Sequence, residues 1–150
     1  MGLGHHIILT QEKLEEHKFP PGFGSGQYGA LVSFDGVVRS RNCQKTVVGI
    51  EFDIHERLAY RALEKICDEA SKQFDAHMRI ILLHRFGHIP VGELSVRIHV
   101  ASAHRDAAFL ACRFLIEELK RRVTIWKLEK YIDGTSSWLK GNSLVEEPNL

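Results

Sequence analysis

The sequence predicts an α+β fold with a mostly antiparallel sheet and two long helices. Strand and helix patterns follow one another in the order β-α-β-β-α-β-β-α-β-β, and the links between neighbouring strands are short. Short links favour antiparallel pairing, because a parallel pair needs a crossover of about a dozen residues or more. Hydrophobic residues make up 44% and charged residues 26% of the 150 residues, which is typical of a soluble globular domain.

The N-terminal part is expected to contain a strand, a short helix and a loop. Residues 6–10 form a short apolar run, which is typical of a strand. Thr10 is placed to cap a short helix over residues 11–18. Residues 19–29 are dense in Pro and Gly, which predicts a loop. Their glycine spacing resembles a nucleotide-binding fingerprint, but that fingerprint lies between a strand and a helix, and here a strand follows.

Two strands are expected after that loop. The first covers residues 28–40, with a break at Asp35-Gly36, where a glycine inside a strand indicates a bulge. A polar turn over residues 40–45 leads to the second strand, over residues 46–55. Apolar and polar residues alternate there, which predicts a half-buried strand with one inward face. The residues expected on that face are Val48, Ile50, Phe52 and Ile54.

The middle of the chain predicts a helix followed by two strands. Residues 56–74 repeat apolar side chains at helical spacing, so we expect an amphipathic helix lying on a sheet. Residues 78–86 are expected to form a buried strand, and residues 87–92, which contain Pro90, a turn. Residues 94–102 alternate again and predict a second strand. Its inward residues are expected to be Leu94, Val96, Ile98 and Val100.

The C-terminal part predicts a second long helix and a hairpin. The helix is expected to begin after Ser102 and to end near Arg122. Residues 124–131 have the pattern of a strand. An Asp133-Gly134 turn is consistent with a hairpin to residues 137–139.

The length and charge of the chain predict one domain that binds neither nucleic acid nor a membrane. We expect a single domain over residues 1–150, in which residues 1–27 hold the first strand, the short helix and the Gly-rich loop, and residues 141–150 form a mobile tail. The formal net charge of +1 predicts no bulk attraction to nucleic acid or to a membrane. Three widely spaced cysteines predict neither a disulfide framework nor a zinc site, and they suit a reducing cytoplasm.

His104 and Arg105 are the first candidates for a binding site. They fall in the opening turn of the second long helix, where unpaired backbone N–H groups and the positive end of the dipole favour an anion. Arg105 adds a bidentate donor suited to phosphate. The alternative is that Arg105 is a solvated charge and that His104 only helps to cap the helix.

Lys120 and Lys127 are the second candidates, at the other end of the same segment. Lys120 suits the helix C-terminus by charge alone, so it has an ordinary structural explanation. Lys127 lies between apolar neighbours on a short strand, where a lysine can act as an acid, a base or a nucleophile. Most lysines are only solvated, which leaves both explanations open.

The helix length separates these two pairs of residues. Fifteen residues between Arg105 and Lys120 correspond to a rise of about 22 Å. One small substrate does not easily touch both within one chain. If both serve one site, a second copy of the protein has to supply one end, which predicts a site shared across a two-fold dimer.

The remaining reactive side chains suggest neither a metal nor a cofactor. The nine histidines show no spacing typical of metal ligands, so we expect no metal site. There is no Ser-His-Asp order around a nucleophile elbow. Cys112 falls in the middle of the second helix and is expected to be packed rather than reactive. We therefore expect no bound cofactor.

Four motifs in order give the sequence a resemblance to a known family. They are FDGVVRS at residues 34–40, HRFGHIPVGELSV at 84–96, SAHRDAAFLACRFLIEELK at 102–120 and IWKLE at 125–129. This combination resembles the MoaE family, the large catalytic subunits of molybdopterin synthase, over residues 28–139. The resemblance implies an α/β-hammerhead fold and a homodimer that forms a heterotetramer with a small ubiquitin-like, MoaD-like sulfur carrier. It also implies that the carrier's C-terminal Gly-Gly thiocarboxylate enters a pocket, and that two sulfurs pass to cyclic pyranopterin monophosphate to form the molybdopterin dithiolene.

The resemblance also implies roles for particular residues. Lys120 and Lys127 match the essential lysines of the family, with Lys120 as general acid–base and Lys127 neutralising charge on the substrate and the thiocarboxylate. Arg39 matches a pocket arginine, and Phe34 lies in the motif that lines this pocket. Three further residues match positions that support the site: Glu129 would orient Lys127, and His104 and Arg105 would hold the substrate phosphate in the neighbouring subunit's site.

The sequence departs from the family pattern at several places, among them an unusually glycine-rich loop over residues 19–26 and a tail after Leu139 that looks truncated. Thr124 stands where the family usually has proline, Asp35 stands where a small or neutral residue is commoner, and residues 51–55 read EFDIH. These departures concern the rim of the pocket and the choice of partner. Two alternatives remain: a non-catalytic homologue that keeps the carrier-tail groove, and an unrelated domain that binds a phosphate ligand.

Overall fold

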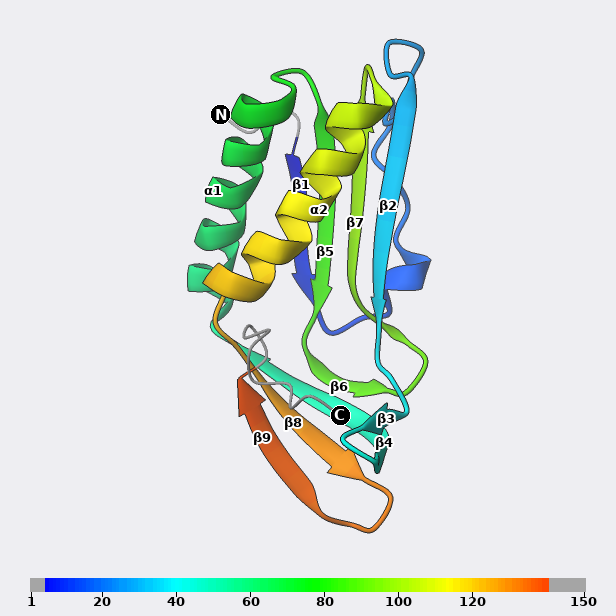
Figure 1. The fold of residues 1–150 in the computed structure, drawn as a ribbon, viewed down its shortest axis with the longest axis vertical. Coiled ribbons are helices and arrows are strands. Elements are labelled where there is room, and N and C mark those ends of the chain that lie inside the picture. Colours follow the sequence, from blue (N-terminus) through cyan, green and yellow to red (C-terminus); the bar gives the residue numbers. More distant parts are fainter. Residues whose placement is uncertain (1–4, 141–150) are drawn as a thin grey trace.

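The protein consists of two sheets joined end to end, and two helices lie on one face of the larger sheet (Figure 1). The computed structural model describes residues 5–140. The larger sheet has the strand order β1-β5-β7-β2, formed by His5–Thr10, Arg79–Arg85, Leu94–Ser102 and Ala30–Val37. Only β1 and β5 are parallel; the other neighbours are antiparallel. The predicted α+β class is therefore confirmed.

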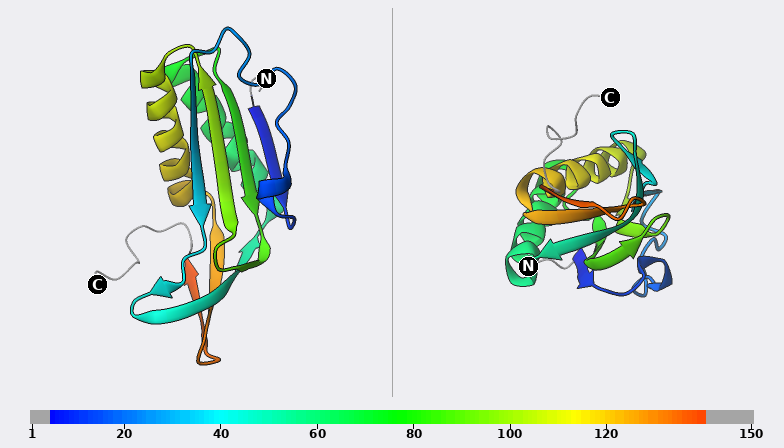
Figure 2. Two further views of the ribbon diagram at one scale, coloured as in Figure 1. Left: turned by 90° about the vertical axis from the view of Figure 1, so that its right-hand side faces the viewer. Right: turned by 90° about the horizontal axis from the view of Figure 1, so that it is seen from below.

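Both long helices cover the same face of this sheet (Figures 1 and 2). Helix α1 spans Glu56–Phe74 and helix α2 spans Arg105–Arg122, close to their predicted bounds. His55 caps α1, because its Nδ1 accepts a hydrogen bond from the backbone N–H of Leu58 at 3.3 Å. Each helix buries an apolar stripe in the core: Ala59, Leu63, Ile66, Cys67 and Ala70 from α1, and Ala108, Ala111, Cys112, Leu115 and Leu119 from α2.

The opposite face of the sheet is covered by the N-terminal segment (Figure 2). Leu14 is fully buried there and packs with Ile81, Leu83 and Leu94. The helix predicted over residues 11–18 was wrong: the segment forms only a 3₁₀ turn, η1, at Leu14–Glu16. The Thr10 side chain accepts from the N–H of Glu12 at 3.0 Å in a tight local turn, and Leu14 is the only buried residue of η1. One anchoring side chain does not offset the cost of helix nucleation.

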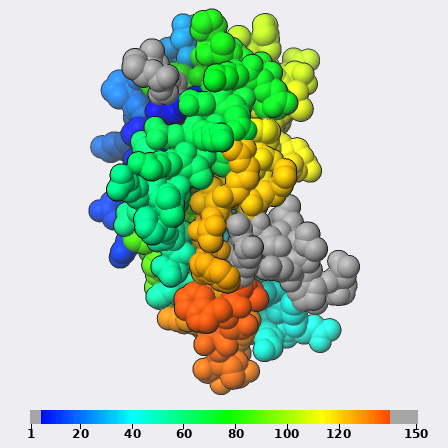
Figure 3. All heavy atoms as spheres, turned by 90° about the vertical axis from the view of Figure 1, so that its left-hand side faces the viewer, coloured from blue at the N-terminus to red at the C-terminus, as the bar shows by residue number. Residues whose placement is uncertain are grey.

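The second sheet continues beyond one end of the first. Its order is β3-β4-β8-β9, formed by Arg41–Asn42, Lys45–Ile54, Ile125–Tyr131 and Ser136–Lys140, and β6, Gly87–Pro90, pairs with β4. The core is continuous between the two sheets, because one cluster of buried side chains includes residues of both. In the space-filling view of Figure 3, the end of α2 and the residues after it lie against α1 and lead down to β8 and β9.

Two local predictions in this second sheet were wrong. The turn predicted over residues 87–92 contains strand β6, because the fully buried Ile89 pairs with Ile50, and Pro90 sits at the last position of the strand. Val48, predicted to face inward, is 48% exposed, whereas Val47 is buried. The pairing register with β8 shifts between Val47 and Gly49, and an irregularity of this kind breaks simple alternation.

The bulge predicted near Asp35-Gly36 is confirmed. The register of β2 against β7 shifts between Gly36 and Val37. Asp35 lies opposite Arg97, which donates two hydrogen bonds to its carboxylate at 2.8 and 2.9 Å. This bidentate pair lowers the pKa of Asp35. Asp35, which departs from the family pattern, thus forms an ion pair across the two strands.

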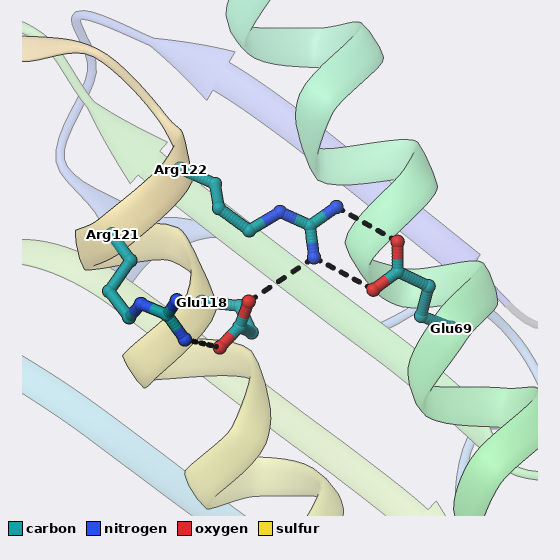
Figure 4. A network of polar contacts seen from close by, with 4 residues as sticks. All are labelled: Glu69, Glu118, Arg121 and Arg122. Atoms are coloured by element: carbon teal, nitrogen blue, oxygen red, sulfur yellow. Dashed lines mark hydrogen bonds and ion pairs between the residues drawn. The ribbon is translucent and has the colours of Figure 1, made fainter.

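Arg122 ties the two helices together near the end of α2 (Figure 4). Its guanidinium donates to both carboxylate oxygens of Glu69 on α1, at 2.7 and 2.8 Å, and to Glu118 on α2 at 3.2 Å. Arg121 donates to the other oxygen of Glu118 at 2.9 Å.

Along residues 5–140, no helix is both long and apolar enough to cross a membrane.

Replacing Arg122 by alanine is expected to lower the thermal unfolding midpoint, because Glu69 and Glu118 lose a shared bidentate partner between the helices. The decrease in the unfolding midpoint should become smaller as salt is added, because salt screens the ion pairs. Arg113→Ala is the matched control: its partner Glu117 lies one turn away on the same helix, and its side chain is 78% exposed. Equal losses for the two variants in thermal unfolding scans would contradict a special role for the interhelical network.

Candidate active site

A basic cavity of about 250 Å³ lies where the two sheets and the end of α2 meet. We use this name for the hollow lined by Val37, Val38, Arg39, Arg41, Ile50, Phe52, Ser95, Lys120, Lys127 and Glu129. Two larger hollows, of about 520 and 470 Å³, lie elsewhere on the protein. Neither gathers as many arginine and lysine side chains as the basic cavity, so the chemistry of the residues, rather than the volume, selects the candidate site.

The two predicted lysines meet in this cavity from different elements. Lys120 lies in the last turn of α2 and is half-buried, beside the buried Leu119 that fixes the helix on the core. Lys127 lies on β8 opposite Phe52 of β4. It is half-buried, whereas the neighbouring Trp126 is 45% exposed, as alternation along a strand requires. The packing of α2 against the sheet therefore brings both lysines to one hollow.

Four cations and one carboxylate give the cavity a positive charge. Arg39 follows β2 and Arg41 opens β3, and both line the cavity together with Lys120 and Lys127. Among the described residues that line the cavity, Glu129 is the only acidic one. A concave site with this excess of positive charge attracts anions such as a phosphate or a carboxylate.

Glu129 is held firmly in the wall of the cavity. It is only 4% exposed, and its Oε1 accepts hydrogen bonds from Asn42 Nδ2 at 2.7 Å and from the Tyr131 hydroxyl at 2.9 Å. Burial, together with the bond to Glu129, raises the pKa of Tyr131 to about 12, so the phenol stays protonated as a donor. Asn42 and Tyr131 were not foreseen from the sequence, because nothing local marks them as partners of Glu129.

His84 is a second residue that sequence reasoning placed in a motif but gave no role. Its ring lies edge-to-face on Phe52 of the cavity wall, with centroids 5.6 Å apart. Its Nδ1 donates to the backbone carbonyl of Arg85 at 2.8 Å, which fixes the tautomer, since a carbonyl oxygen only accepts. Burial, with a smaller contribution from the charge of Lys120, lowers the pKa of His84 to about 4. The imidazole behind the cavity is therefore neutral at neutral pH.

The stability of the protein is expected to fall between pH 6.5 and pH 4 partly because of His84. Its folded-state pKa of about 4 lies below the ordinary 6.5, so the unfolded state takes up a proton first as the pH falls. The contribution of His84 to the free energy of unfolding is fully present above pH 6.5, and about 3 kcal/mol of that free energy is lost by pH 4. In His84→Asn, which keeps a donor for Arg85, denaturant unfolding should show a shallower pH dependence. His88→Asn, at an exposed site on β6, should behave like the wild type.

The other predicted site residues lie outside the basic cavity. His104 and Arg105 are exposed at the start of α2, at the opposite end from Lys120 (Figure 1). The His104 side chain makes no capping hydrogen bond. Phe34 lies on β2 and is 36% exposed, but it does not line the cavity. The structure thus brings together Arg39, Lys120, Lys127 and Glu129, and it leaves Phe34, His104 and Arg105 elsewhere on the chain.

Metal-ligand side chains do not gather in the described residues. No group of three or more His, Cys, Asp or Glu within residues 5–140 is placed to hold a metal ion. All three cysteines are free thiols, and Cys67 and Cys112 are buried. Burial raises the pKa of Cys112 to about 11, which keeps it a packed, protonated thiol as predicted.

Comparisons with known proteins agree on one family. A family model described as MoaE protein matches residues 9–122. The molybdopterin synthase catalytic subunit of Synechococcus elongatus is 46% identical over 81% of this chain and 73% of its own length. The protein of that name from Arabidopsis thaliana is 38% identical over 94% and 70% of the two chains. A crystal structure of molybdopterin synthase from Staphylococcus aureus shares the fold with a TM-score of 0.77, at 28% identity over 89% of this chain and 95% of that chain.

The family match covers most of the described residues and includes three of the four cavity cations, Arg39, Arg41 and Lys120. The relatives extend the similarity over nearly the whole chain at well above 30% identity. The resemblance inferred from the four sequence motifs is therefore confirmed, and the chain belongs to the MoaE protein family.

Proposed function

We propose that this protein is the catalytic subunit of a molybdopterin synthase. It transfers sulfur from a thiocarboxylated carrier subunit to cyclic pyranopterin monophosphate and so forms the dithiolene of molybdopterin. The observation that carries this proposal is the convergence of Arg39, Lys120 and Lys127 in one cavity, in a chain 46% identical to a molybdopterin synthase catalytic subunit.

The charges of the basic cavity suit both reactants. The phosphate of the precursor and the thiocarboxylate of the carrier are anions, and the cavity offers four cations against one carboxylate. Each transfer moves a sulfur from the carrier's C-terminus to a carbon of the pterin and leaves the carrier with a carboxylate. Expulsion of oxygen from that carbon needs a proton donor, which we assign to Lys120. Lys127 neutralises the charge of the substrate and of the thiocarboxylate.

The partner is proposed to be a small ubiquitin-like carrier that inserts its Gly-Gly tail into the basic cavity. The name catalytic subunit, carried by the relatives, implies a further subunit in their enzymes. An extended glycine tail suits a narrow site, because it has no side chains to accommodate. The apolar lining residues Val37, Val38, Ile50 and Phe52 offer contacts to such a backbone.

A second copy of the chain is proposed to complete each site, within a heterotetramer of two large and two carrier subunits. Exposed apolar side chains gather on β2, the edge strand of the larger sheet, and on α2. These residues are Leu31, Phe34, Val37, Phe109 and Leu110. Such a surface suits burial against a second copy. His104 and Arg105 lie on the same helix and would reach the neighbour's substrate phosphate.

We also propose that residues 1–150 form one domain in a reducing cytoplasm. The large buried cluster that includes residues of both sheets and the free state of the three cysteines support this. The strand and loop expected within residues 1–27 are present from residue 5 onward, with η1 in place of the short helix. The tail expected over residues 141–150 lies outside the described residues.

The direct test is to mix the protein with a thiocarboxylated carrier and cyclic pyranopterin monophosphate and to assay for the dithiolene product. Product formed in proportion to the thiocarboxylate supplied would support the proposal. A precursor that binds without turnover would instead favour a non-catalytic homologue that only holds the phosphate or the carrier tail.

A further inference from the structure

Glu129 is the one acidic side chain among the described residues that line the basic cavity, and two neighbouring side chains hold it through one oxygen. Asn42 Nδ2 and the Tyr131 hydroxyl donate to Oε1, at 2.7 and 2.9 Å. A carboxylate with free rotation could alternate between several cations, whereas one that is held by two donors keeps a single orientation towards them.

Asn42 reaches Glu129 from a tight turn between β3 and β4. Arg41 and Asn42 pair with Thr46 and Lys45, so only Cys43 and Gln44 form the turn. Both have left-handed φ values, of 52° and 67°, although neither is glycine. Such conformations are costly for residues with a side chain and persist where the surroundings stabilise them.

Side-chain contacts on both sides of the turn supply that stabilisation. The Cys43 thiol donates to Asn42 Oδ1 at 3.4 Å, which leaves the amide Nδ2 directed at Glu129. The Lys45 ammonium lies 4.6 Å from the centre of the Tyr131 ring. The turn thus contacts both Glu129 and Tyr131 of β8, and it holds Arg41 at the cavity.

We propose that Asn42 and Tyr131 are positioning residues that fix the Glu129 carboxylate in the cavity that it lines together with Lys127, so that Lys127 stays directed at the substrate. This role rests on the proposed sulfur transfer. It adds to that reaction two residues that do not line the basic cavity. Neither residue touches the substrate; each acts through Glu129.

The cations around Glu129 determine how loss of the two donors would show. Arg39, Arg41, Lys120 and Lys127 line the cavity with it. Removal of either donor frees the carboxylate to turn among these cations, so Lys127 should lose its fixed direction and the chemical step should become slower.

The first measurement is the ionisation of tyrosine followed by ultraviolet absorbance, in the absence of substrate. The chain has three tyrosines, and Tyr131→Phe identifies the signal of Tyr131. In Glu129→Gln, the pKa of that phenol should fall by about one unit, since the neighbouring negative charge is gone. An unchanged titration would overturn the proposed network, whatever the function of the protein.

The second measurement compares kcat and KM for dithiolene formation in Asn42→Ala and Tyr131→Phe. We expect kcat to fall about tenfold with KM nearly unchanged. Tyr60→Phe, which removes a hydroxyl from an exposed tyrosine of α1, is the matched control and should match the wild type. In a Glu129→Gln background, Tyr131→Phe should cause no further change.

The outcomes separate the positioning role from the proposed function. Folded variants with the kcat of the wild type would overturn the positioning role alone. If Asn42→Ala does not fold, Tyr131→Phe decides the question, because it keeps the ring beneath Lys45. If the wild type itself forms no dithiolene, the proposed function fails and the positioning role with it, and the tyrosine titration still shows whether the network exists.

Discussion

Lys120→Ala is expected to abolish dithiolene formation while the fold and the binding of the carrier remain intact. The substitution removes the proposed general acid and one of four cavity cations, and loss of a positioned acid typically costs about 10²- to 10⁴-fold in rate. The fold should tolerate the change, because Lys120 is half-buried at the end of α2 and alanine favours helix. Single-turnover assays with saturating carrier measure the chemical step, and circular dichroism and thermal unfolding report on the fold.

Two further variants test whether the reaction needs the proton of Lys120 or only its positive charge, and whether a neighbouring cation matters as well. Lys120→Arg keeps the positive charge but hardly releases a proton at neutral pH, so it should stay slow. Arg121→Ala removes the next cation along the chain, whose side chain is 67% exposed and pairs with Glu118, and should remain active. Full activity in Lys120→Ala, or in Lys120→Arg, would refute the assignment of Lys120 as the acid.

The regular elements were predictable because their side-chain pattern has a single period. Helix α1 keeps one apolar repeat from end to end, and the bounds of α1 and β7 agree with those predicted. In β7 the predicted inward face holds for Val96, Ile98 and Val100, whereas Leu94 packs with Leu14 in the other cluster. The errors fall where tertiary contacts override local signals. Ile89 draws a Gly- and Pro-containing segment into β6, and the register shift after Val47 turns Val48 outward.

The candidate site was predictable only in part, for a similar reason. The resemblance pointed to Arg39, Lys120, Lys127 and Glu129, and the structure places these four around one cavity. It could not point to Asn42, which lies 87 residues from Glu129 in the sequence. The neutral state of His84 likewise depends on its burial behind Phe52, which no local pattern reveals.

One relation between the site residues did follow from elementary geometry. The rise of an α-helix puts Arg105 and Lys120 about 22 Å apart, and both lie on the single helix α2. His104 and Arg105 are exposed at one end, whereas Lys120 lines the basic cavity at the other. A site that uses both ends needs two chains, and this requirement can be tested by mixing defective variants.

Mixed dimers of Lys120→Ala and Arg105→Ala are expected to recover activity that neither variant has alone. If each site takes Lys120 from one copy and Arg105 from the other, a mixed dimer holds one site with both defects and one intact site. Random mixing should then restore about a quarter of the wild-type sites, since about half of the dimers are mixed. The variants would be co-expressed with different tags, and the dithiolene assay would be run on the purified mixture.

The matched control is a mixture of Lys120→Ala and Lys127→Ala. Both lysines line the same cavity of one chain, so every site of a mixed dimer keeps one defect and no recovery is expected. Equal recovery in the two mixtures, or none in the first, would contradict a shared site. A monomer with full activity would contradict it independently, because one chain would then perform the reaction with the two ends of α2 about 22 Å apart. Recovery in the first mixture alone would mean that α2 connects two active sites and completes neither by itself.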